Sequence, residues 1–474
     1  MTTTDARTPR TVHSRRAFLG GTLAGTAAAL SWSLQRGLAA DGKPILEVGQ
    51  GTVDITPPLG VEMAGFHRPP GQERRIKGIR QPTAVRALAL RYREQQAVLV
   101  SLDVVAFPRD YTARVQQAIA AKTGLAAANV RLCATHSHST PTFVKLRQWG
   151  GLSLEYIAAV ERQILEAVQQ AQQDLTPAEL FVGQAPTVGG NFNRTTKTWK
   201  TDLEFTPESS DDQRWLDTLL QVLRFERGTA KPALVWYHFS AHPVCYTDDQ
   251  AGPDWPGIVA ARLLAEHQLQ PSYLQGHCGD VNPGDGDPWI GSPDKTSKAV
   301  YAALQQALGS AQRVAVDGLR TATTEFAAPL DLARFQEELA RYQREPSKCT
   351  GAEWVDAGFA QDWATWAATW DVKKTAQPTP LSALRLGPVG LVFHPAELYS
   401  YYGIQIRRDS PFPHTFVVGY TDDILGYLPD PNAYKAAEYA AIVVPKILSL
   451  PPFTPDAGRA LSAASRQLLK QVAG

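Results

Sequence analysis

The chain of 474 residues is 44% hydrophobic and 20% charged, and its 47 lysines and arginines nearly balance its 46 aspartates and glutamates. A chain this close to neutral, without a basic stripe or a run of like charge, excludes a nucleic-acid-binding protein and a membrane-surface helix. Its length and hydrophobic content allow a large core, and the absence of repeats, low-complexity segments and long linkers predicts one large domain or two closely packed ones.

The first 40 residues carry the features of an export signal. A twin-arginine pattern, Ser-Arg-Arg-Ala-Phe-Leu, covers 14–19 and is followed by a Gly/Ala-rich run and by small residues before position 41. A transmembrane anchor is the alternative, but the run is too short and too rich in Gly, Ala and Thr to cross about 30 Å of hydrocarbon. We therefore predict a twin-arginine signal peptide over 1–40, transient binding to the twin-arginine translocation machinery, no transmembrane anchor, and a periplasmic or secreted bacterial protein.

Strand and helix patterns alternate along the remaining domain, 41–474. Apolar and alternating segments predict strands over 47–55, 87–92, 97–105, 130–135, 180–187, 219–226, 233–239, 272–275, 319–326 and 389–393. Amphipathic segments predict helices over 109–122, 154–173, 256–266 and 294–311. This order predicts an α/β fold with a mixed β-sheet, or sheets, covered by helices and with functional sites at the loop ends.

A tryptophan-bearing helical stretch follows the strand over 319–326. Trp363, Trp366 and Trp370 recur at a spacing that places them on one helical face. We interpret this stripe as core packing, with the wall of an apolar substrate channel as the alternative.

Two histidines follow the strand predicted over 130–135. His136 and His138 are two residues apart, so in an extended segment both project to the same side. Two imidazoles that leave a strand together suggest a metal site, whereas the alternative is a pair of polar residues that cap a turn.

Two further polar segments lie at strand ends. His242 ends the strand over 233–239 and precedes a proline, and a Gly-rich loop after the strand over 272–275 holds His277, Asp280 and Asn282. Glycine allows the backbone to approach a ligand closely, but the same residues are ordinary turn formers, so both interpretations stay open.

A buried strand over 389–393 runs into a segment that we predict to be helical, and Glu397 lies in the first turn of this predicted helix. An acidic residue at that position also interacts favourably with the helix dipole, which is an alternative explanation for the glutamate. The next polar segment carries Tyr427, Tyr434 and Tyr439.

The four cysteines raise the question of disulfides in an exported protein. Cys133, Cys245 and Cys278 lie in apolar or motif segments, and we interpret them as small buried hydrophobic residues, with thiolate ligation as a secondary alternative. Cys349 lies in a polar loop.

Together these segments resemble the neutral/alkaline, non-lysosomal ceramidase family over residues 47–445. The resemblance rests on six features in the family's order: Gly-Thr-Val-Asp-Ile-Thr-Pro-Pro at 51–58 with Met-Ala-Gly-Phe at 63–66, Ala-Thr-His-Ser-His-Ser at 134–139, Phe-Ser-Ala-His at 239–242, Gly-Asp-Val at 279–281, Glu397, and the spacing of Tyr427, Tyr434 and Tyr439.

The resemblance implies a ceramidase-like catalytic domain with one Zn2+ per chain. The implied zinc ligands are His136, His242, Glu397 and Tyr427. Zinc accepts imidazole and carboxylate ligands, and a catalytic site keeps a position open for water.

The resemblance also implies roles for residues around the zinc. Those that act on the substrate and the developing oxyanion are His138, Arg194 and Tyr439. We also expect the loop after the strand over 272–275 to contribute Asp280, Asn282 and His277 to substrate binding, where His277 has no obvious counterpart in the family and would supplement the site.

The sequence departs from the family at Asn282, which replaces a serine and leaves water activated by zinc as the attacking group. The chain also ends near the end of the family's catalytic domain, so we expect no C-terminal immunoglobulin-like domain.

The sequence therefore predicts a zinc-dependent amidohydrolase that cleaves the N-acyl bond of a lipid or of a smaller amide. The alternatives are a zinc-dependent esterase or amidase with a smaller, non-lipid substrate, and a degenerate relative that only binds a ligand. The presence of all four implied zinc ligands argues against the last of these.

Overall fold

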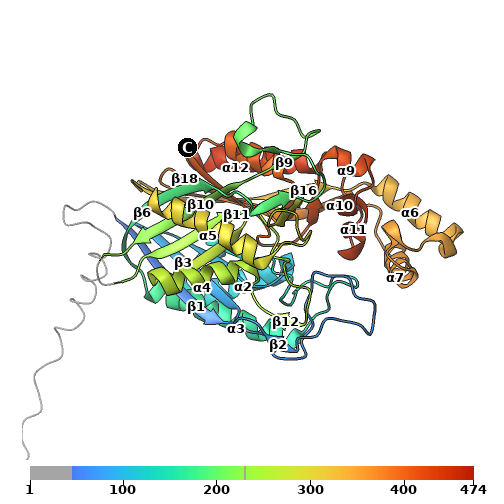
Figure 1. The fold of residues 1–474 in the computed structure, drawn as a ribbon, viewed down its shortest axis with the longest axis horizontal. Coiled ribbons are helices and arrows are strands. Elements are labelled where there is room, and N and C mark those ends of the chain that lie inside the picture. The colour runs from blue at the N-terminus through green and yellow to red at the C-terminus, as the bar shows by residue number, and fades with distance from the viewer. Residues whose placement is uncertain (1–44, 229–230) are drawn as a thin grey trace, which may run out of the picture. The chain divides into compact units, whose positions relative to one another are not determined.

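The structure, a computed structural model, describes residues 45–228 and 231–474 (Figure 1). The predicted signal peptide lies outside the described residues. Residues Ile45–Gly474 form one compact unit. Among the described residues, no helix combines the length and the hydropathy that a membrane crossing requires.

The largest element is a nine-stranded mixed sheet with the order β13-β11-β10-β6-β1-β3-β4-β5, in which β15 also pairs with β6. The pairs β4–β5 and β11–β13 are parallel and the others are antiparallel. Its strands are β1 (Leu46–Asp54), β3 (Ala84–Tyr92), β4 (Gln95–Leu102), β5 (Val130–Ala134), β6 (Thr176–Pro186), β10 (Leu219–Glu226), β11 (Leu234–Phe239), β13 (Pro271–Gln275) and β15 (Gln312–Val314).

A second sheet of four strands, in the order β16-β17-β18-β20, packs against the first. Its strands are β16 (Leu319–Pro329), β17 (Ala376–Leu386), β18 (Val389–Phe393) and β20 (His414–Val418). On β3, Leu88 and Leu90 join Leu391 of β18 in one core, while the alternating Val85 and Ala87 join the core beneath the helices. This period of two means that β3 buries both of its faces.

Helices cover the two outer faces. The helix α3 (Leu154–Gln173) packs on β1 and β3, α5 (Pro293–Gly309) packs on β6 and β10, and α4 (Trp255–His267) packs on β13 and α5. The C-terminal helix α12 (Ala457–Ala473) packs on β16, β17 and β18, so α12 and α3 lie on opposite sides of the strands (Figure 1). The predicted α/β class with mixed sheets covered by helices is confirmed.

The remaining elements are short. Four two-stranded pairs join β2 (Gly78–Ile79) with β12 (Gln250–Ala251), β7 (Asn191–Asn193) with β14 (Val281–Pro283), β8 (Lys200–Thr201) with β9 (Trp215–Leu216), and β19 (Ala396–Leu398) with β21 (Gly426–Leu428). The other helices are α2 (Arg109–Thr123), α6 (Leu332–Arg344), α7 (Ala357–Ala367), α8 (Ser400–Arg408), α9 (Pro431–Lys435), α10 (Tyr439–Ile442) and α11 (Val444–Ile447).

Two local predictions are wrong. Glu397 lies in β19 and not in the first turn of a helix, because the segment pairs in parallel with β21 before α8 begins at Ser400. Trp370 lies beyond the end of α7, so the three tryptophans do not share one helix. Trp363 is fully buried, and Trp366 and Trp370 pack at the edge of its core, in agreement with the core interpretation.

All four cysteines are buried and unpaired. The interpretation of Cys133, Cys245 and Cys278 as buried hydrophobic residues is confirmed, and Cys349, expected in a polar loop, is buried as well. Burial raises the pKa of the Cys133 thiol to about 12, which disfavours the thiolate that metal ligation requires.

The buried His394 predicts a specific pH dependence of stability. Burial, followed by the neighbouring His277 and His238, lowers the pKa of His394 to about 3 in the folded chain, against about 6.5 when unfolded. The unfolded state therefore binds the extra proton between these values, and stability is lost as the pH falls below about 6.5. We expect the free energy of unfolding of the wild type, relative to His394→Asn, to fall by about 2 kcal/mol from pH 7 to pH 5 in urea titrations. If the free energies of unfolding of the wild type and of His394→Asn differed by the same amount at pH 7 and at pH 5, this assignment would be contradicted.

Candidate metal centre

The first sheet curls, and this brings its two edge strands together. Ser101 of β4 donates a hydrogen bond to the carbonyl of Tyr273 in β13 (2.7 Å), although the two strands lie near opposite ends of the strand order. The amide of Gln275, at the end of β13, donates to the carbonyls of Thr135 (3.3 Å) and Ala241 (3.0 Å). The chain therefore leaves β5 and β11 toward the same place, carrying His136 and His242.

Backbone carbonyls fix the orientation of both imidazoles. His136 Nδ1 lies 2.8 Å from the carbonyl oxygen of Val105, and His242 Nδ1 lies 2.8 Å from that of Val281. Because a carbonyl only accepts, each Nδ1 carries the hydrogen and each Nε2 presents a lone pair. Burial, and then Arg194, lowers the pKa of His242 to about 4, so this imidazole is neutral at pH 7.

Glu397 faces both of these lone pairs. Its Oε2 atom lies 3.5 Å from His136 Nε2 and 3.3 Å from His242 Nε2, and Tyr427 Oη lies 3.4 Å from His242 Nε2. The β19–β21 pairing places Glu397 directly opposite Tyr427.

These separations fit a bound metal. Ligand bonds of about 2.0–2.1 Å at tetrahedral angles separate ligand atoms by about 3.3–3.5 Å, which is the range found here. Two imidazoles and a carboxylate are also a donor set that zinc prefers. The predicted ligands His136, His242, Glu397 and Tyr427 are thus brought together by four segments that are distant in sequence.

His138 offers a second, overlapping donor set. Its Nε2 lies 3.2 Å from His136 Nε2, and the ligating atoms of His136, His138 and His242 lie within 4.8 Å of one another. Unlike the other two imidazoles, His138 has no hydrogen-bond partner at Nδ1 that would orient it as a ligand. Its ring packs on Gly65, where a Cβ atom would lie 2.3 Å from the ring, so the glycine of the Met-Ala-Gly-Phe segment makes room for it.

Arg194 lies beside the candidate ligands. Its Nη2 donates to Tyr427 Oη (2.6 Å) and to the carbonyl of Gly279 (2.8 Å), and its Nη1 donates to Asn282 Oδ1 (3.2 Å). The backbone N–H of Arg194 donates to the carbonyl of Asp280 (2.8 Å). The structure thus places Asn282 and Asp280 around Arg194, in positions that hold the arginine.

The structure does not bring His277 to this site. His277 is fully buried, and its Nε2 lies 2.8 Å from the Asp217 carboxylate, which also pairs with Arg407. Sequence reasoning missed this arrangement, because Asp217 lies 60 residues earlier, without a motif around it.

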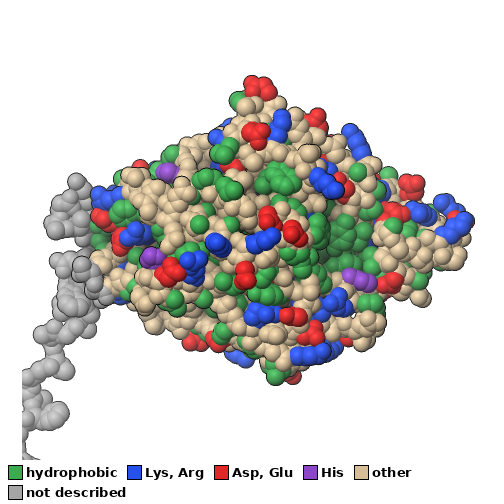
Figure 2. All heavy atoms as spheres, in the orientation of Figure 1, with side chains coloured by type: hydrophobic (Ala, Val, Ile, Leu, Met, Phe, Trp, Pro, Cys, Tyr) green, Lys and Arg blue, Asp and Glu red, His purple; other side chains and the backbone are tan. Residues whose placement is uncertain are grey.

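A pocket with an open volume of about 450 Å3 lies over the candidate ligands. Its polar part consists of His136, His138, Glu397 and the phenols of Tyr427 and Tyr439. The rest of the lining is apolar: Gly65, Val105, Ala106, Leu146, Trp149, Ile424, Val444, Ile447 and Leu448. Hydrophobic side chains gather over α10 and α11 beside a hollow of the surface (Figure 2).

Two segments that no sequence motif marked supply the apolar wall. The loop 145–151 carries Leu146 and Trp149, and α11 carries Val444 and Ile447. Arg147 joins the loop to the helix, because its backbone N–H donates to the carbonyl of Ile447 (2.9 Å) and its Nε donates to that of Lys446 (3.1 Å). Tyr439 stays 45% exposed, with its ring 6.4 Å from those of Trp149 and Tyr427.

Comparison with known proteins gives one sequence match and several structural ones. The model of the family described as neutral/alkaline non-lysosomal ceramidase, N-terminal, matches residues 46–300. Neutral ceramidase from Pseudomonas aeruginosa superimposes with a TM-score of 0.67 and 20% identity, covering 90% of this chain and 74% of that chain. A structure described as ceramidase complexed with C2 gives a TM-score of 0.67 and 19% identity, covering 90% and 75%. A search of curated proteins found no match.

The geometry predicts which histidines a metal needs. We expect His136→Ala and His242→Ala to lower zinc affinity by more than about a hundredfold. Loss of a residue that merely orients a ligand lowers metal affinity by about ten- to a hundredfold, and loss of the ligand itself should lower it further. We expect His138→Ala to retain about one zinc per chain, since Glu397 and Tyr427 complete the site. Metal analysis of the purified variants after dialysis measures the occupancy.

His267→Ala, at the end of α4, is the matched control, because it removes an imidazole outside the pocket. Zinc loss in His138→Ala equal to that in His242→Ala would instead assign the metal to the three histidines.

Proposed function

Because this chain belongs to the neutral/alkaline non-lysosomal ceramidase family, we propose that it is a zinc-dependent amidohydrolase that cleaves the N-acyl bond of a ceramide-like amide. One observation carries this proposal. A set of zinc-type donors, His136, His242, Glu397 and Tyr427, lies at the polar end of a pocket whose other walls are apolar.

Zinc held by these donors would activate a water molecule for attack on the amide carbonyl. The residues of the chain then handle charge and protons. Arg194 and Tyr439 would stabilise the negative charge that develops on the carbonyl oxygen, Arg194 acting next to Tyr427, to which it donates a hydrogen bond. His138, beside His136, would take a proton from the attacking water and return it to the nitrogen of the leaving amine as the C–N bond breaks. The products are a carboxylic acid and an amine, and transfer of the acid proton turns them into a carboxylate and an ammonium group.

The pocket supports a neutral substrate with an apolar acyl chain. Glu397 is the only acidic residue of the lining, it belongs to the ligand set, and no lysine or arginine contributes to the wall. Away from Arg194 and the candidate ligands, the described lining offers no charged partner for a substituent, whereas Trp149, Val444 and Ile447 offer apolar surface.

Asn282 takes no part as a nucleophile in this proposal. Its Oδ1 accepts from Arg194 and its Nδ2 donates to the carbonyl of Trp289 (2.7 Å). We assign it and Asp280 to holding Arg194, in place of the direct substrate contact expected from the sequence, and we assign His277 no contact with the substrate.

We also propose that the twin-arginine translocation machinery exports the protein to the periplasm or the medium, with 41–474 as the mature hydrolase. The twin-arginine pattern at 14–19 and the apolar run after it support this. A twin-lysine variant of the pattern that still leaves the cytoplasm would contradict it.

Hydrolysis of a fluorescent N-acylsphingosine by purified 41–474 tests the function. We expect turnover that a chelator abolishes and added zinc restores, with a long acyl chain preferred to acetyl because it covers more of the apolar wall. The panel includes the matched ester and a short, non-lipid amide. Cleavage of the ester alone, or amide cleavage that resists the chelator, would contradict the proposal.

Tyr439→Phe isolates one oxyanion donor. We expect kcat to fall by roughly one to three orders of magnitude with zinc content unchanged, because the phenol is lost and the ring is kept. Tyr434→Phe is the control, since Tyr434 is buried in the core and does not line the pocket. Equal kcat values for the wild type and Tyr439→Phe would remove Tyr439 from the mechanism.

A further inference from the structure

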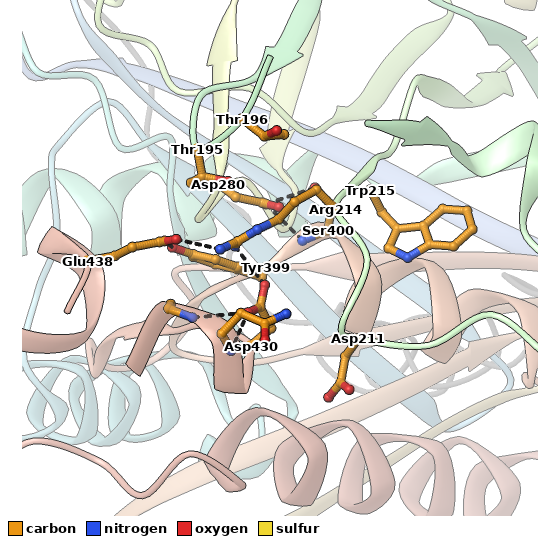
Figure 3. Close-up of polar contacts among 12 residues, drawn as sticks. Thr195, Thr196, Asp211, Arg214, Trp215, Asp280, Tyr399, Ser400, Asp430 and Glu438 are labelled. Atoms are coloured by element: carbon orange, nitrogen blue, oxygen red, sulfur yellow. Dashed lines mark hydrogen bonds and ion pairs between the residues drawn. The ribbon is translucent and has the colours of Figure 1, made fainter. Parts of the chain in front are cut away.

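Arg214 binds two carboxylates of the segment that leads to Tyr439. Its Nη1 donates to Asp430 Oδ2 (2.7 Å), and its Nη2 pairs with Glu438 Oε1. Figure 3 shows the guanidinium between these two carboxylates, alongside the ring of Tyr399. Tyr399 Oη in turn lies 3.2 Å from Glu438 Oε2. Because the two carboxylates are eight residues apart, one side chain holds both ends of the segment 430–438.

Both carboxylate residues also begin helices. Asp430 Oδ1 accepts from the backbone N–H groups of Asn432 (2.9 Å) and Ala433 (3.2 Å), which caps α9. Glu438 is the N-cap residue of α10, whose first residue is Tyr439. Arg214 thereby fixes the position of Glu438, the residue directly before Tyr439.

The segment has little stability of its own. The helix α9 has five residues and α10 has four, far below the length at which a helix is stable without tertiary contacts. The turn between them passes through Ala437 at φ +52°, a left-handed conformation that is unfavourable for a residue with a Cβ atom. The direction of Tyr439 therefore depends on contacts from outside the segment.

Arg214 is itself held on the rigid part of the site. Its backbone carbonyl accepts from Lys200 (2.9 Å), and that of the next residue, Trp215, accepts from Asn193 Nδ2 (2.8 Å). Asn193 Nδ2 also donates to Asp280 Oδ2 (2.8 Å). Asp280 Oδ1 accepts from the N–H and the hydroxyl of Ser400 (2.8 Å each), beside Arg214 (Figure 3). One polar scaffold thus connects the strand before Arg194 with Arg214.

The ion pairs are well shielded from water. The side chains of Arg214, Asp430 and Glu438 are 15%, 4% and 23% exposed. Exposed pairs contribute little, but removal of one partner from a shielded pair leaves the other charge uncompensated. Loss of Arg214 would therefore leave Asp430 and Glu438 without their cationic partner and would loosen the segment 430–438.

We propose that Arg214 is a positioning residue that fixes Tyr439 at the pocket by clamping Asp430 and Glu438. The proposal rests on the function proposed above, in which Tyr439 acts on the substrate. A purely stabilising role for Arg214 is the competing explanation, and the experiments below separate the two.

The first test is a double-mutant cycle in 41–474 with fluorescent N-acylsphingosine. We expect Arg214→Met to lower kcat by about ten- to a hundredfold, with KM changed less than about threefold and zinc content unchanged, because misplacing one group by about 1 Å costs this much. In the Tyr439→Phe background the same substitution should cost less than about threefold, since its target is already lost. If the double variant lost kcat by the product of the two single-variant factors, Arg214 and Tyr439 would act independently and the proposal would be overturned.

Arg459→Met is the matched control. Arg459 also binds a carboxylate with two nitrogens, those contacts being to Asp211 (2.6 and 2.7 Å), but it lies on α12 and does not touch the segment 430–438. We expect its kcat to equal that of the wild type. If Arg214→Met does not fold, Glu438→Gln replaces it, because it keeps the acceptor for Tyr399 and loses the ion pair; about a three- to tenfold fall in kcat is expected.

Hydrogen exchange measured by mass spectrometry tests the clamp without substrate. Peptides that cover 430–442 should exchange faster in Arg214→Met, or in Glu438→Gln, than in Arg459→Met, while peptides from β5 and β11 stay unchanged. Equal exchange of 430–442 in all variants would overturn the proposal. A failure of the proposed function would instead appear as absent turnover in the wild type.

Discussion

The Glu397 carboxylate, enclosed between the lone pairs of His136 and His242, is the constraint on which the rest of the site depends. A buried carboxylate is costly unless a cation compensates its charge. The fold commits several features to this arrangement: the curl that joins β5 to β13, the carbonyls of Val105 and Val281 that fix the two rings, and the β19–β21 pairing that sets Glu397 opposite Tyr427. Such a set is suited to a bound divalent metal.

The pocket above this centre has a polar end and an apolar wall. Polar groups concentrate where the reaction would occur, and the loop 145–151 together with α11 forms an apolar wall beside them. Arg194, on one side, is held by Asn282 and by backbone groups of the Gly-rich loop. Tyr439, on the other side, lies on a short and weakly stabilised segment. The difference explains why the tyrosine needs a clamp such as Arg214 and the arginine does not.

The sequence predicted the parts of the site that follow from local patterns. The strands β5 and β11 are mostly apolar and end abruptly, so His136 and His242 could be placed at strand ends. The resemblance to a family supplied Glu397, Tyr427 and Arg194. The helix predicted around Glu397 was wrong because a three-residue strand such as β19 has no periodicity to detect.

Long-range contacts were beyond local reasoning. Nothing in the sequence indicates that the edges of the first sheet meet, that Asp217 pairs with His277, or that Arg214 reaches Glu438 across more than 200 residues. The same holds for Trp149 and α11, whose apolar side chains look like ordinary core residues until the fold places them in one wall.

We propose that a zinc ion binds to His136, His242, Glu397 and Tyr427 at the end of the apolar pocket. Anomalous diffraction on either side of the zinc edge, from crystals of 41–474 grown with zinc at one equivalent, tests it most directly. We predict one strong peak per chain within about 2.2 Å of His136 Nε2, His242 Nε2 and a Glu397 oxygen. A peak held by His138 in place of Glu397, or no peak in this pocket, would contradict it.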